Sequence, residues 1–172
     1  DSNGITISSG NLIIPDSIIH GGDSDTKIRF PAANTFSVET GGVERMRSGS
    51  ANVFNETGVD MDFRVEGDTD ANLLFGDAST DRIGIGTSSP SKKFHVVSSD
   101  YQTARFESTA TDANGSYIEM NANSSSPADN DILGLLSFRG NNSAAENLSY
   151  AHVRGIATDV TDGTEDGEIL FH

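Results

Sequence analysis

The feature that most constrains this chain is a period-two alternation of apolar residues in short segments. Alternation places every second side chain on one face, which is the pattern of a half-buried β-strand. Clusters of Gly, Asn and Asp separate the segments, and these residues tolerate the positive φ angles of tight turns. The sequence therefore predicts an all-β protein. The alternating segments are residues 5–7, 12–14, 28–30, 36–38, 61–65, 73–75, 83–85, 94–96, 104–106, 117–120, 136–138, 150–157 and 169–171.

Composition excludes several classes of function. The 172 residues contain no cysteine, which rules out disulfide scaffolds, thiolate metal sites and thiol catalysis. A net charge of −15, with no Lys/Arg cluster, disfavours nucleic acids and anionic membranes as partners. The longest apolar run, residues 132–136, is too short to cross a bilayer, so we expect no membrane insertion. Only 34% of the residues are hydrophobic, which is typical of disordered chains, but the alternation argues for order.

Weak repetition and a change of composition suggest two regions. Phe36-Ser37-Val38-Glu39 recurs as Phe63-Arg64-Val65-Glu66, and each unit is a short predicted strand followed by a turn. Such repeats are typical of elongated structures. After residues 88–91 the predicted strands become longer. We therefore divide the chain into a repetitive β-stem at 1–90 and a more compact antiparallel β-domain at 91–172.

The predicted stem strands carry too few apolar residues for a stable monomer. Each has two or three on one face, and a thin sheet of such strands is marginal alone and exposes unpaired edges. Three copies that point their alternating residues at a common axis would share one narrow core. The pattern favours an elongated homotrimeric β-fibre, whose stem is either a triple β-helix or a prism-like stack of sheets.

Six segments, taken in order, resemble parts of the fibre proteins of tailed bacteriophages. The third of them contains Gly84-Ile85-Gly86-Thr87, and the last three are similar to the fibre domain that commonly precedes a C-terminal chaperone. The resemblance extends over roughly residues 25–172, and the order and density of the motifs carry it. The segments are residues 42–47, 63–75, 77–96, 136–141, 150–155 and 162–167.

The resemblance implies a homotrimeric structural protein on the virion, outside the host cell, that contributes to attachment without catalysis or a cofactor. It implies other tail or baseplate proteins as partners, together with a glycan of the host surface. Two features depart from the family. The self-cleaving chaperone with a Ser–Lys dyad does not follow His172, so we expect the second domain to be truncated. Ser48-Gly49-Ser50 stands where an apolar residue usually continues the repeat, as a natural loop or as a junction.

Two other functions stay open. One is a fragment of a polysaccharide-degrading tailspike, whose chemistry needs a pair of carboxylates. The chain has 26 Asp and Glu residues, so pairs will occur by chance, and it lacks Trp as a glycan platform. The other is a bacterial trimeric surface adhesin or filament with the same repeat physics.

No set of residues has the spacing of a catalytic, cofactor or metal site, and we assign none. His20, His95, His152 and His172 occur singly, so we expect ordinary strand residues. The alternative is a three-fold axis that gathers His95 or His152 from three copies around an ion.

Three further motifs have structural explanations. The acidic loop 68–72 lacks the later glycine and glutamate of a calcium loop, and the acidic cluster at 159–168 is typical of a solvated turn. Residues 84–87 lack the Lys-Ser/Thr pair and the helix of a phosphate loop. Arginines within predicted strands are expected to pair with acids across strands or subunits. These are Arg29, Arg64, Arg82, Arg105, Arg139 and Arg154.

Overall fold

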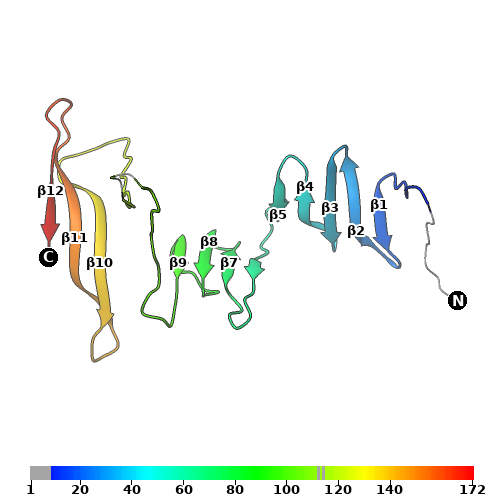
Figure 1. Cartoon of the computed structure of the whole chain (residues 1–172), viewed down its shortest axis with the longest axis horizontal. Helices are drawn as coiled ribbons and strands as arrows, with labels where there is room; N and C mark the ends of the chain where they lie inside the picture. Colours follow the sequence, from blue (N-terminus) through cyan, green and yellow to red (C-terminus); the bar gives the residue numbers. More distant parts are fainter. Residues whose placement is uncertain (1–8, 112, 114) are drawn as a thin grey trace. The chain divides into compact units, whose positions relative to one another are not determined.

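The chain is all-β, as its alternation predicts. A computed structural model describes residues 9–111, 113 and 115–172, and the regular structure within them is β-strand throughout. The chain divides into two units, Asp1–Arg105 and Phe106–His172. The first unit holds two sheets, which we name sheet A and sheet B, and the second holds sheet C (Figure 1).

Sheet A is an antiparallel meander in which neighbours in sequence are neighbours in space. Its strands are joined by tight turns at residues with positive φ, among them Gly22, Asn34, Gly41 and Gly42. Ser48-Gly49-Ser50 lies at the last turn of this sheet, where Gly49 N donates to Ala51 O at 3.0 Å. The strands are β1 (Ser17–His20), β2 (Asp23–Ala32), β3 (Thr35–Thr40), β4 (Val43–Ser48) and β5 (Asn52–Phe54).

Sheet B contains β6 (Phe63–Val65), β7 (Leu74–Asp77), β8 (Arg82–Ile85) and β9 (Phe94–Val96). The first three strands are antiparallel, and β9 runs parallel to β8. One sheet thus continues through residue 90, and the division into a stem and a compact domain stays a prediction.

Close packing explains the glycines of the Gly84-Ile85-Gly86-Thr87 segment. A Cβ at Gly84 would lie 2.3 Å from Thr87 O, and one at Gly86 would lie 2.2 Å from Val97 O. Gly86 also has a φ of +69°, which side chains rarely adopt. Its N–H donates to Asn72 O at 2.9 Å. The segment therefore serves as a structural connection, in agreement with its lack of phosphate-loop features.

Sheet C is an open antiparallel sheet of three longer strands, β10 (Asp131–Asn141), β11 (Asn147–Asp159) and β12 (Asp166–Phe171). A hairpin joins β10 to β11, with Ala145 at φ 60°. The described residues contain only three buried hydrophobic side chains, Phe75, Ile156 and Ala157. Each sheet is therefore a layer with little core of its own.

The strand predictions are correct in part. Residues 12–14, 104–106 and 117–120 alternate but form no strand, because no described segment pairs with their backbone as a ladder. The expected strand at 5–7 lies outside the described residues. Strands β1, β4 and β5 were not predicted by alternation, since their apolar residues are too few or adjacent in sequence.

Replacing Gly86 by Ala tests the packing argument. The variant meets both an unfavourable φ and the Val97 carbonyl, so we expect a clear loss of stability. Gly41→Ala is the matched control, because Gly41 also has a positive φ but has open space around it. The control should cost about 1–2 kcal/mol, the penalty of the left-handed conformation alone. Thermal unfolding followed by circular dichroism compares them, and equal losses would refute the role of the close contact.

Candidate functional site

One face of sheet A carries an apolar row that crosses all five strands. The register places Ile18 opposite Ile28, Ile28 opposite Val38, Val38 opposite Met46 and Met46 opposite Phe54. Directly opposed residues point to the same side of a sheet and contact each other. Yet Ile18, Ile28 and Phe54 are exposed, with Phe54 54% accessible. The described residues do not cover this row.

The opposite face of sheet A is charged but largely covered. Lys27 Nζ lies 3.4 Å and Arg29 Nη1 lies 3.2 Å from the Glu39 carboxylate. Arg47 binds Glu44 through two hydrogen bonds of 2.9 and 3.0 Å. Ser37 sits between the two arginines in the register and is fully buried. The long stems of Arg and Lys close this face, so the apolar face is the one left open.

The carboxylates also act on the two arginines electrostatically. The hydrogen bond that Arg29 donates to Glu39 raises the pKa of Arg29, and those that Arg47 donates to Glu44 raise the pKa of Arg47. Both guanidinium groups thus remain charged, and the Arg29–Glu39 pair spans two strands, as we expected for arginines within strands. Other arginines bind oxygens of their own unit, such as Arg82 to Pro90 O at 2.9 Å and Arg139 to Asn147 O at 2.9 Å.

Sheet B also carries an apolar row on one face. Phe63 lies opposite Gly76, Gly76 opposite Ile83, and Ile83 opposite Phe94. Phe63, Ile83 and Phe94 are all exposed, and Phe94 is 62% accessible. The next pairs on the same face, Val65–Leu74 and Ile85–Val96, are apolar as well.

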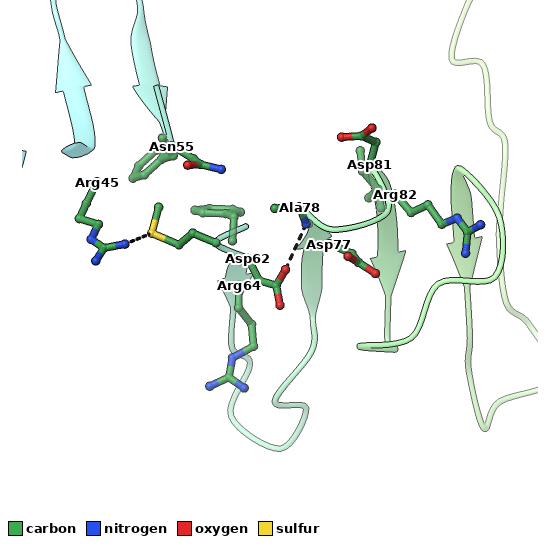
Figure 2. A pocket seen from close by; sticks show the side chains of 13 residues that line it. Arg45, Asn55, Asp62, Arg64, Asp77, Ala78, Asp81 and Arg82 are labelled. Carbon is green, nitrogen blue, oxygen red and sulfur yellow. Dashed lines mark hydrogen bonds between the residues drawn. The ribbon is translucent and has the colours of Figure 1, made fainter. Parts of the chain in front are cut away.

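The rows of sheets A and B meet at an aromatic contact. The ring centroids of Phe54 and Phe63 are 5.1 Å apart, with the planes tilted by 44°. Beside this contact lies an open pocket of about 510 Å³ (Figure 2). Phe54, Met61, Phe63 and Ile83 form its apolar wall. The pocket therefore lies where residues of the two apolar rows meet.

Most polar groups around this pocket already have partners within the chain. Arg45 donates to Thr40 Oγ1 at 2.6 Å and contacts Met61 Sδ at 2.9 Å. Asp62 Oδ1 accepts from the Ala78 N–H at 3.1 Å, as Figure 2 shows. Asp77 Oδ1 accepts from Ser79 Oγ and from Thr80 N. These groups hold loops in place, so the pocket is better suited to an apolar partner than to acid–base chemistry.

The structure brings two of the four histidines together. His152 and His172 exchange backbone hydrogen bonds of 3.0 Å, and their rings lie 4.7 Å apart. His95 is instead held in its own sheet, where its Nδ1 accepts from Ser91 N at 3.3 Å. Among the residues that the structure describes, no group of three His, Asp or Glu side chains is placed to hold a metal ion.

The acidic loops use their carboxylates to form turns. Asp70 Oδ1 accepts from the Asn72 N–H at 2.8 Å. Asp159 accepts from the Thr161 N–H at 2.8 Å and from the Thr164 hydroxyl at 3.2 Å. Hydrogen bonds from Thr161 and Thr164 lower the pKa of Asp159.

Comparison with known proteins gives no relative: the chain matches no protein-family model, no curated protein and no solved structure. Among the described residues there is no helix long and apolar enough to cross a membrane.

The turn beside the pocket gives a pH prediction. Hydrogen bonds from Ser79 and then Thr80 lower the pKa of Asp77 below its ordinary 3.8. A lowered pKa in the folded state means that the stabilisation is present above pH 3.8 and is lost as the pH falls through the folded-state value. Ser79→Ala removes the main donor, so the pKa of Asp77 should move back up. Carboxyl ¹³C NMR titration measures both midpoints, and an unchanged midpoint in the variant would contradict the assignment.

Proposed function

We propose that this chain is a structural and adhesive segment of a tailed-bacteriophage fibre. It acts as a homotrimer on the virion, outside the host cell, and contributes to attachment to the host surface without catalysis. Its partners are two further copies of itself, other tail or baseplate proteins, and a host-surface glycan. The motifs that resemble fibre proteins support the family, and the exposed apolar faces support the assembly.

The observation that carries the proposal is the amount of surface that the chain leaves exposed. Its accessible surface is 13514 Å². A compact monomer of 18.1 kDa exposes about 8,000 Å², and the same mass in two compact domains about 10,000 Å². The excess of about 3,500 Å² or more falls in the range of permanent oligomer interfaces, about 2,000–5,000 Å².

Three copies can bury this excess surface against one another. Each sheet is one layer thick, with an apolar row on one face and polar or charged side chains on much of the other. Pointing the rows at a common axis covers them and keeps the carboxylates in water. The assembly is then an elongated β-fibre, with sheets A and B in its stem as a triple β-helix or a prism-like stack.

Mass and shape in solution test the assembly. Sedimentation velocity with light scattering should give about three times the chain mass of 18.1 kDa and the friction of an elongated particle. We also expect the assembly to resist heat and SDS, because the interface replaces the missing monomer core. A well-folded particle with the mass of one chain would overturn the homotrimer.

The function has its own test, apart from the assembly. Incubation with a panel of capsule and lipopolysaccharide glycans should release no reducing ends, while retention of one of these glycans on the immobilised protein is expected. Release of reducing ends would favour the polysaccharide-degrading tailspike. Neighbouring genes for baseplate or capsid proteins would support the phage fibre over a bacterial adhesin, and their absence would count against it.

A further inference from the structure

The register of sheet C separates its side chains into two unlike faces. On one face Leu136 lies opposite Val153 and Val153 opposite Phe171, flanked by the pairs Phe138–Ala151 and Gly155–Ile169. Every side chain in these rows is apolar. We name this set of residues the apolar face of sheet C.

The other face of sheet C is mixed. It carries Leu135, Arg154 and Leu170 in one row, and Ser137 beside His152 in the next. Glu168 also belongs to it, opposite Ile156. Arg154 and Glu168 thus lie on the side away from the apolar face, while Asp131, opposite Ala157 at the start of β10, lies beyond its end on the same side.

The apolar face contains a hollow at its centre. Met120 covers Gly134, where a Cβ would lie 2.8 Å from the Met120 side chain. At Gly155, next to it in the register, a Cβ would meet nothing within 4 Å. The result is a hollow of about 220 Å³ bounded by Met120, Leu136, Val153, Gly155 and Ile169, among others.

We propose that the apolar face of sheet C is the contact between copies of this chain in the unit Phe106–His172, and that the hollow at Gly155 receives an apolar side chain of a neighbouring copy. This proposal rests on the homotrimer proposed above and assigns the face that forms it in this unit. The most exposed residue of the face is Phe171, which is 77% accessible and therefore free to reach another copy.

Charge explains why a second copy fits this face. The chain has a net charge of −15, so two copies repel each other wherever their charged surfaces meet. The residues of the apolar face carry no charge, and the carboxylate on the same side, Asp131, lies at the end of the sheet, so identical faces can pack at their centre without bringing like charges together. Arg154 and Glu168 lie on the other face, away from this contact. The surplus of accessible surface calculated above is also of the size that permanent oligomers bury.

Two adjacent leucines provide a matched test. Leu135 and Leu136 are consecutive in β10, point to opposite faces and have nearly equal exposure, 48% and 51%. Leu136→Lys places a cation on the apolar face, and Leu135→Lys places the same cation on the mixed face. Both variants reduce the net negative charge equally. A difference between them therefore cannot come from a change in the overall repulsion between copies.

Sedimentation equilibrium, run at a denaturant concentration at which the wild type begins to dissociate, measures the protein concentration at which each variant dissociates. Leu136→Lys should raise this concentration at least about tenfold, the effect of 1.4 kcal/mol, while Leu135→Lys should leave it unchanged. Circular dichroism checks that both variants keep their strands. If Leu136→Lys unfolds, Gly155→Lys replaces it, because that change removes no side chain and enters open space.

The outcomes separate this inference from the proposed function. A wild-type chain that is monomeric overturns the homotrimer and this contact with it. A trimeric wild type whose Leu136→Lys or Gly155→Lys variant stays trimeric leaves the homotrimer standing and overturns the assigned face. Equal dissociation of the Leu135 and Leu136 variants also overturns the assignment.

Discussion

The structure depends on one constraint: a single layer of β-sheet cannot bury its own apolar face. Each of the three sheets has such a face, and the described chain buries only Phe75, Ile156 and Ala157 among its hydrophobic residues. Full burial of one large apolar side chain contributes about 1.5–3 kcal/mol, so covering the exposed rows of Ile, Leu and Phe would stabilise the chain. The proposed homotrimer would meet this requirement.

The charged face of sheet A determines which side of that sheet is available for association with another copy. Glu39 and Glu44 are buried and bound by Lys27, Arg29 and Arg47, whose stems also cover Ser37. Opening this face would leave buried carboxylates without partners, which is costly. Association through the apolar row disturbs none of these ion pairs. The ion pairs on one face and the exposed apolar row on the other therefore both favour association through the apolar row.

The polar motifs of the sequence have local roles in the structure. Asp70, Asp77 and Asp159 accept backbone N–H groups in turns, and Gly84 and Gly86 allow backbone segments to approach each other. The carboxylates of the acidic loops thus stabilise turns, and the two glycines allow close backbone packing. What the described residues leave open is apolar surface, which the proposed assembly would cover.

Sequence alone determined the strand character of most segments, because alternation of apolar residues is a local property. It also located many turns, since Gly22, Gly41 and Gly42 adopt the positive φ angles that their residue type allows. The strand prediction was wrong at 104–106 and 117–120. A strand also needs a neighbouring strand to pair with, and a local sequence pattern does not show whether one is present. Only the tertiary structure decided which residues share a face across strands, how Phe54 meets Phe63, and that Gly155 lies in open space. These depend on register between distant segments, and a shift of one residue would exchange the two faces of a sheet.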